Sequence, residues 1–135
     1  MSYLLLKTEP RSYSFADLER DGATVWDGVR NALALSHMRN VKAGDEVILY
    51  HSGNESSAVG LAKVRRGAYP DPGSDDERIV VFDITPVRRL ERPVSLKELK
   101  SDPAFSGSDL ARLPRLSVVP LSTAQWRRIL ALARG

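Results

Sequence analysis

The stretch Val25-Trp26-Asp27-Gly28-Val29-Arg30-Asn31 is the most informative segment of this sequence. It contains too many polar and glycine residues for a core element, yet Trp26 is large and apolar for a plain turn. Trp26 offers a broad aromatic face, and Asn31 carries a donor and an acceptor that can match the edge of a nucleobase. A structural interpretation fits equally well: Trp26 fills the core, Gly28 adopts a positive φ and Asn31 caps a helix. On these residues alone, the segment indicates either a binding pocket or a turn that leads into a helix.

The rest of the sequence predicts short strands and short helices on both sides of this segment. Apolar and β-branched runs predict strands at residues 3–8, 25–26, 47–52, 58–66, 79–87 and 115–119. Capping signals predict helices that begin at Ser14, Asn31, Ser95 and Ser122. Five or six strands with short flanking helices predict one α+β domain over residues 1–135, with the strands closing into a small, partly open barrel.

The bulk composition is that of a globular protein. The chain has 135 residues, 42% of them hydrophobic and 27% charged, which fits one domain with a real core. It has no cysteine, so disulfides and thiolate metal sites are excluded, and this suits the cytoplasm. The apolar run Leu4-Leu5-Leu6 is too short for a signal peptide or a membrane span, and we expect no membrane contact.

Catalytic interpretations find little support. The two histidines, His37 and His51, have no spacing typical of a zinc site, so no metal and no cofactor are expected. His51 and Ser52 are neighbours in a predicted strand, where adjacent side chains point to opposite faces and cannot form a base–nucleophile pair. Glu9 and Asp27 could be paired carboxylates, but their spacing does not indicate a hydrolase. The sequence therefore predicts a binding module and not an enzyme.

Basic residues are in slight excess, with a net charge of +3. The segment with Lys63, Arg65 and Arg66 is the best candidate for contacts to a nucleic-acid backbone. The alternative is that these side chains are the solvated face of a strand.

Several motifs occur in a fixed order along nearly the whole chain. They are Leu5-Leu6-Lys7-Thr8-Glu9-Pro10, Tyr13-Ser14, Val25 to Asn31, Lys42-Ala43-Gly44-Asp45, Tyr50-His51-Ser52 and Arg115-Leu116-Ser117-Val118-Val119-Pro120. In this order and spacing the sequence resembles the EVE domain family, a branch of the PUA-like fold related to YTH and ASCH domains. The resemblance implies a single EVE domain, built as a mixed-strand pseudo-barrel with short flanking helices.

The resemblance also implies a pocket that recognises a modified base in DNA or RNA. Trp26 looks like the counterpart of a tryptophan in the aromatic cage of YTH domains, where it would stack on the base. The other residues that it suggests as ligand-binding are Asn31, Ser52, Lys7, Glu9, His51, Arg115 and Ser117. This sequence departs from the family pattern in Ala34-Leu35-Ser36, where many members have Ala-Arg-Asn, and in Leu4, where a tryptophan is usual.

Three other functions stay open at this point. The chain could bind RNA regardless of modification, or hold a free nucleobase or nucleoside. Base-modifying chemistry would use a similar pocket and would depend on Glu9 or Asp27.

Overall fold

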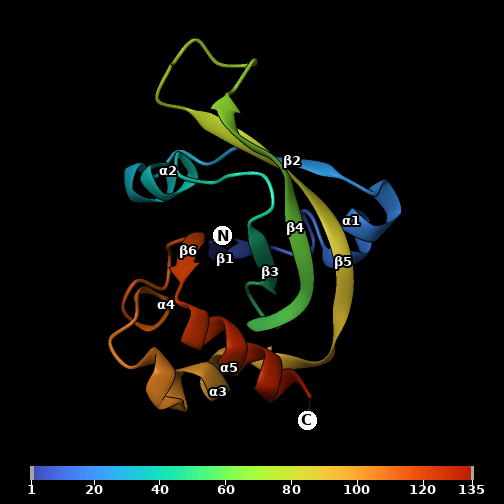
Figure 1. Cartoon of the computed structure of the whole chain (residues 1–135), viewed down its shortest axis with the longest axis vertical. Coiled ribbons are helices and arrows are strands. Elements are labelled where there is room, and N and C mark those ends of the chain that lie inside the picture. The colour runs from blue at the N-terminus through green and yellow to red at the C-terminus, as the bar shows by residue number, and fades with distance from the viewer. Residues whose placement is uncertain (1, 135) are drawn as a thin grey trace.

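The computed structural model describes residues 2–134, which are arranged around a strongly curved, six-stranded mixed sheet (Figure 1). The strand order is β2-β5-β4-β3-β1-β6. The strands are β1 (Tyr3–Thr8), β2 (Thr24–Trp26), β3 (Glu46–His51), β4 (Ser57–Pro70), β5 (Val80–Ser95) and β6 (Val118–Leu121). β1 and β3 run parallel, and the other neighbouring pairs are antiparallel. The predicted α+β class and strand number are confirmed, but the barrel does not close, because β2 and β6 each pair on one side only within the described chain.

Short helices flank the sheet, and the starts of α1, α2, α3 and α5 follow the predicted capping signals. They are α1 (Phe15–Asp21), α2 (Ala32–Met38), α3 (Leu96–Ser101), the 3-10 turn η1 (Pro103–Phe105), α4 (Asp109–Arg112) and α5 (Thr123–Ala133). Ser14, Ser95 and Ser122 each form a reciprocal capping box with the residue three positions on. The Asn31 side chain accepts a hydrogen bond of 3.0 Å from the Ala34 N–H, which confirms its predicted role as a cap.

The two longest strands extend well beyond their predicted ends. β4 continues through Gly67 to Pro70, and β5 continues past Val87 through Pro93 to Ser95. Several register shifts along the β4–β5 pair, typical of β-bulges, accommodate extra residues in the two strands. Such bulges also bend the two-stranded ribbon. The predictions that ended at residues 66 and 87 were wrong because glycine and proline break regular strands but are tolerated at bulges.

The last strand also differs from its prediction. The sequence predicted it at residues 115–119, whereas β6 is Val118–Leu121. It lies at the edge of the sheet, where Pro120 is tolerated because that strand needs hydrogen bonds on one side only. As a result, Arg115 to Ser117 lie in the turn before β6 and not within the sheet.

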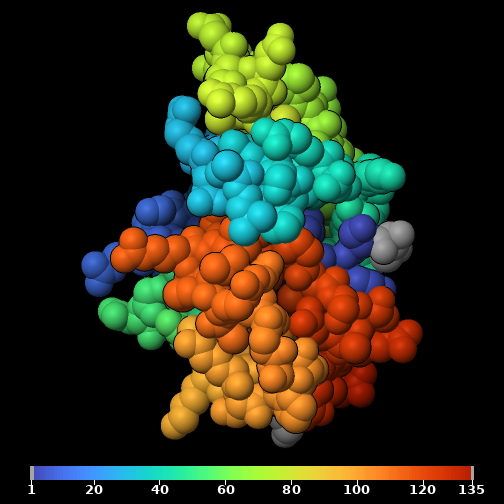
Figure 2. Space-filling model, turned by 90° about the vertical axis from the view of Figure 1, so that its left-hand side faces the viewer, coloured from blue at the N-terminus to red at the C-terminus, as the bar shows by residue number. Residues whose placement is uncertain are grey.

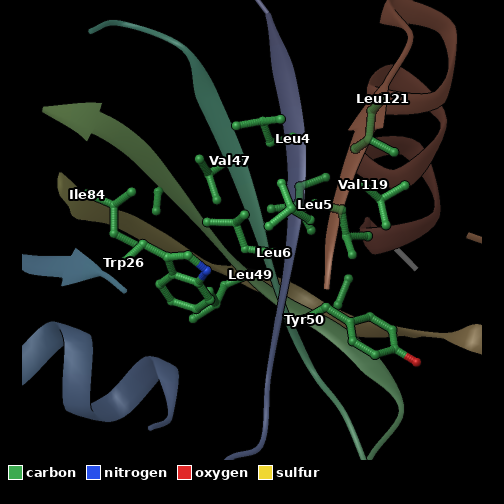
Figure 3. Close-up of a cluster of buried hydrophobic side chains, with 14 of the residues drawn as sticks. Leu4, Leu5, Leu6, Trp26, Val47, Leu49, Tyr50, Ile84, Val119 and Leu121 are labelled. Carbon is green, nitrogen blue, oxygen red and sulfur yellow. The ribbon is translucent and has the colours of Figure 1, made fainter. Parts of the chain in front are cut away.

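The core is built around β1, which is buried on both faces. Leu4, Leu5 and Leu6 are 4%, 0% and 0% exposed. Figure 3 shows them between side chains of β3 and β6, with Trp26 beside Leu49 at the β2 end of this cluster. Trp126 of α5 is also buried and stacks on Tyr3 with ring centroids 4.8 Å apart, which extends the core to this helix.

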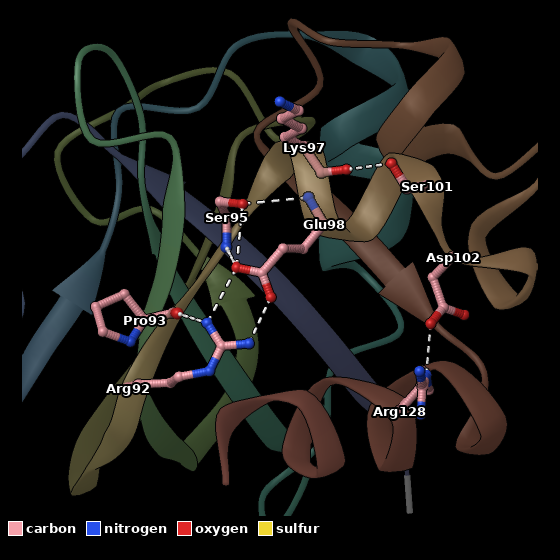
Figure 4. Close-up of polar contacts among 8 residues, drawn as sticks. All are labelled: Arg92, Pro93, Ser95, Lys97, Glu98, Ser101, Asp102 and Arg128. Atoms are coloured by element: carbon pink, nitrogen blue, oxygen red, sulfur yellow. Dashed lines mark hydrogen bonds and ion pairs between the residues drawn. The ribbon is translucent and has the colours of Figure 1, made fainter. Parts of the chain in front are cut away.

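Ion pairs join the end of β5 and the following helices (Figure 4). The Arg92 guanidinium donates to both carboxylate oxygens of Glu98, at 3.0 and 2.6 Å, and Arg128 of α5 donates to Asp102. The hydrogen bonds from Arg92, followed by a bond from the Ser95 backbone N–H, lower the pKa of Glu98 to about 2. The bond from Arg128 likewise lowers the pKa of Asp102.

These shifts predict a loss of stability in acid. A carboxyl group whose pKa is lowered in the folded state stabilises the fold above its unfolded pKa of about 4.3, and this stabilisation disappears as the pH falls towards about 2. Glu98→Gln retains a side chain that can complete the capping box, but it loses the charge. It should therefore lower the melting temperature at neutral pH. The difference in melting temperature between the variant and the wild type should become smaller from about pH 5 downwards. Thermal unfolding followed by circular dichroism measures this difference. Glu91→Gln, at an exposed position, serves as the matched control. A difference in melting temperature between Glu98→Gln and the wild type that stays constant down to pH 2 would contradict the prediction.

Candidate functional site

A pocket of about 400 Å³ lies where the end of β1, the β1–α1 loop and β2 come together. It is lined by Lys7, Thr8, Glu9, Ser12, Tyr13, Thr24, Val25, Trp26, Asp27, Val29 and Ser117. This volume falls within the usual range for small-ligand pockets, roughly 300–1,000 Å³. The structure thus brings together four of the predicted site residues: Trp26, Lys7, Glu9 and Ser117. A hollow of similar size, about 350 Å³, at the other end of β1 contains none of the predicted site residues.

Trp26 belongs to both the core and the pocket. It pairs with Phe82 of β5 and is 8% exposed, so most of the indole is buried. Among residues 2–134, no side chain or carbonyl group accepts a hydrogen bond from its indole N–H. Figure 3 shows this nitrogen pointing towards β1, whose far end forms a wall of the pocket. An indole N–H is a donor only, and this one has no acceptor within the described residues.

Lys7 brings a positive charge to the same wall. Its Nζ donates a 3.0 Å hydrogen bond to the carbonyl oxygen of Pro114 and lies 5.7 Å from the centre of the Tyr50 ring. Burial, and to a lesser extent the charge of Lys100, lower the pKa of Lys7. The backbone N–H of Lys7 also donates to the Ser117 carbonyl oxygen at 2.9 Å, which fixes the distance between these two lining residues.

Carboxylates supply the acceptors of the pocket. Glu9 Oε1 accepts a 3.0 Å hydrogen bond from the Arg11 N–H, which orients the side chain at the end of the strand. Asp27 is exposed at the mouth. With the hydroxyls of Ser12 and Ser117, the pocket offers both donors and acceptors around one aromatic face, as recognition of a heterocycle edge requires.

Tyr13 is a second aromatic side chain in the lining, and the sequence did not suggest it. Its hydroxyl donates to Asp21 at 2.9 Å, and its carbonyl accepts from the Thr8 hydroxyl at 2.7 Å. Burial is the largest cause that raises the pKa of its phenol. The signal that could have identified it is its position directly before the Ser14 cap, in the short loop between the end of β1 and the start of α1.

Asn31 and Arg115 lie apart from the Trp26 pocket. They line a neighbouring apolar hollow of about 340 Å³ together with Leu33, Leu113, Pro114 and Leu116. Because the Asn31 side-chain oxygen already accepts the Ala34 N–H, its role as a helix cap is the one that the structure uses.

His51 and Ser52 are not part of the pocket lining. His51 is 8% exposed; its Nε2 accepts the Phe15 N–H at 3.0 Å and its Nδ1 lies 3.0 Å from Glu55 Oε1. Both ring nitrogens are therefore engaged inside the protein, and the imidazole joins β3 to the start of α1. The sequence could not reveal this use of His51, because Phe15 is far from it along the chain.

The basic residues of β4 lie outside the pocket but are connected to it across the sheet. Lys63, Arg65 and Arg66 are exposed, and the Arg66 guanidinium lies 3.6 Å from the centre of the Tyr69 ring. Arg66 pairs with Asp83, which in turn pairs with Val25 of the pocket lining. Two strand spacings amount to about 10 Å, so a backbone that leaves the pocket across β2 can reach Arg66.

Within residues 2–134, the His, Asp and Glu side chains form no group of three that could hold a metal ion. No helix in this part of the chain combines the length and the apolar character needed to cross a membrane.

Comparison with known proteins places this geometry in a family. The EVE domain model matches residues 2–132. Rat thymocyte nuclear protein 1 is 33% identical, in an alignment that covers 97% of this chain and 73% of the rat protein. A solved Rhodopseudomonas palustris protein is 33% identical with a TM-score of 0.93, covering 99% of this chain and 94% of its own. Human THYN1, solved in complex with DNA that contains 5-methylcytosine, is 32% identical with a TM-score of 0.85, covering 100% of this chain and 99% of the human chain.

Proposed function

Because the chain belongs to the EVE domain family, we propose that it is a non-catalytic module that binds methylated cytosine in DNA, with the base in the pocket beside Trp26. One observation carries the proposal: Trp26, whose indole N–H has no acceptor within residues 2–134, lines a pocket of base size, in a chain that shares its fold with a protein solved on 5-methylcytosine DNA.

The energy balance of such binding is reasonable. A base that enters the pocket must leave its stack, which costs a few kcal/mol. Stacking on an aromatic side chain returns roughly 1–3 kcal/mol, and hydrogen bonds at the base edge add to this. The Trp26 and Tyr13 side chains supply the aromatic surface, so the pocket is not limited to a single ring.

The polar lining matches a cytosine edge. The exocyclic amine of cytosine is a donor, which the carboxylate of Glu9 or Asp27 can accept. Its ring nitrogen and carbonyl oxygen are acceptors, which Lys7, Ser117 or the Trp26 N–H can satisfy. A methyl group on the ring then packs against the apolar side chains of Val25 and Val29, which line the same pocket.

The basic residues of β4 complete the proposal. Lys63, Arg65 and Arg66 would bind phosphates and position the strand without reading its sequence. Such contacts make the affinity fall as salt rises.

The test is a comparison of DNA oligonucleotides with 5-methylcytosine or cytosine at one position, measured by fluorescence anisotropy at a fixed salt concentration. Burial of one methyl group is worth about 0.8 kcal/mol, so the methylated strand should bind about fourfold more tightly. Equal affinities would reject recognition of the modification and favour a module that ignores it. An RNA arm, and a thermal-shift arm with free 5-methyl-2′-deoxycytidine, distinguish DNA binding from the RNA and nucleoside alternatives.

A further inference from the structure

The apolar hollow beside the Trp26 pocket is open to solvent and poorly explained by folding alone. Its walls are Leu33 on one side and Pro114 and Leu116 on the other. Leu33 is 41% exposed, one of the few large apolar side chains in the described chain that remain so. In Figure 2 the segment that contains α2 (cyan) lies directly against the segment around residues 110–117 (orange) across this face.

This hollow neighbours the Trp26 pocket, because the same two stretches of chain contribute to both. One wall runs from Val29 in the pocket to Asn31 and Leu33 in the hollow, and the other runs from Ser117 to Leu116 and Pro114. The hydrogen bond from Lys7 Nζ to the Pro114 carbonyl connects a lining residue of the Trp26 pocket to a lining residue of the hollow. The two spaces are therefore neighbours along these two stretches of chain.

The charges around the hollow favour a polyanion. Arg30 and Arg115 are both exposed, and neither forms an ion pair with a carboxylate of residues 2–134. Lys7 lies between the two spaces, with its amine at Pro114. Apolar surface flanked by guanidinium groups suits a nucleotide, whose base is apolar on its faces and whose phosphate is negative.

We infer that this hollow binds the base of the nucleotide next to the one held beside Trp26, with Leu33 and Pro114 against the faces of that base and Arg115 at its phosphate. This inference rests on the proposed function and extends it. The module then contacts two adjacent nucleotides, and Leu33 is a binding residue for the second. If an apolar side chain of a partner protein occupies the hollow instead, the affinity for DNA does not depend on the neighbouring nucleotide.

The experiment uses single-stranded oligonucleotides with one 5-methylcytosine, in which the 5′ neighbour, the 3′ neighbour or a distant nucleotide is replaced by an abasic site. Loss of the apolar burial of one base should reduce affinity about tenfold when one of the two neighbours is abasic, and should have no effect at the distant position. Leu33→Ser should remove this tenfold difference, while Val87→Ser, a change at an even more exposed apolar residue of β5, should leave it unchanged.

Two ratios keep the outcomes distinct. The ratio of methylated to unmethylated affinity reports on the Trp26 pocket, and the ratio of intact to abasic affinity reports on the hollow. A methyl preference without any dependence on either neighbour overturns the inference and leaves the proposed function standing. If the affinity depends on a neighbouring nucleotide but Leu33→Ser does not change that dependence, the inference is also overturned. If the wild type shows no preference for the methylated strand, the proposed function is overturned.

Discussion

Trp26→Ala should abolish the preference for methylated DNA and lower the free energy of unfolding by about 3–5 kcal/mol. Both effects follow from the position of the indole, which is 8% exposed in the core and lines the pocket. The sequence left open whether Trp26 lines a pocket or fills the core, and the structure combines the two positions. Chemical denaturation and anisotropy on the same variant measure the two effects.

Trp26→Phe separates the effect on binding from the effect on stability. Phenylalanine retains an aromatic face and most of the buried volume, but it loses the indole N–H. We expect a smaller loss of stability, and a loss of affinity of about three- to tenfold, which is the contribution of one hydrogen bond. Trp126→Phe is the matched control, because Trp126 is 7% exposed and packs on Tyr3 outside the pocket. An equal loss of affinity in both variants would mean that Trp26 acts only through the fold.

The second large effect is expected at Gly60 in β4. A Cβ atom placed there would lie 2.4 Å from the Phe15 ring, a distance that no real contact allows. Phe15 is fully buried at the start of α1, and its N–H is bonded to His51, so the ring cannot easily move. Gly60→Ala should therefore lower the free energy of unfolding by about 1–3 kcal/mol, as overpacked cores do.

A double-mutant cycle identifies the clash as the cause. Phe15→Leu frees space at the ring and should cost stability by itself, but Gly60→Ala should cost much less in that background. Gly73→Ala is the control, because the added Cβ would be 3.4 Å from Asp71, an acceptable contact in the loop after β4. Additive effects of Phe15→Leu and Gly60→Ala in urea unfolding would show that the two residues do not compete for space.

The sequence predicted the helices of this protein better than its strands. The helix starts depend on residues three positions apart, and Ser14, Ser95 and Ser122 carry this information locally. The extent of β4 and β5 depends on pairing between strands, which allows bulges beside Gly67 and Pro86 that no local pattern predicts. The start of β6 was misplaced for a similar reason, since its pairing with β1 decides where the strand begins.

For the candidate site, too, the sequence predicted some features and missed those that depend on contacts between distant segments. Trp26, Lys7 and Glu9 were expected in one pocket because of their motifs, and the structure brings them together with Ser117. His51 belongs to an equally specific motif, but its nitrogens bond to Phe15 and Glu55. A sequence motif identifies residues that matter and does not say whether a polar atom faces a ligand or a distant part of the chain.

The position of β1 has a consequence for synthesis of the protein. β1 lies between β3 and β6, so the first described strand obtains its second neighbour only from Val118–Leu121. A chain emerging from the ribosome leaves one edge of Leu4, Leu5 and Leu6 unpaired until this segment has been translated. Since Ser117 of the pocket wall precedes β6 directly, the nascent chain gains the second neighbour of β1 and this wall of its binding site in the same step.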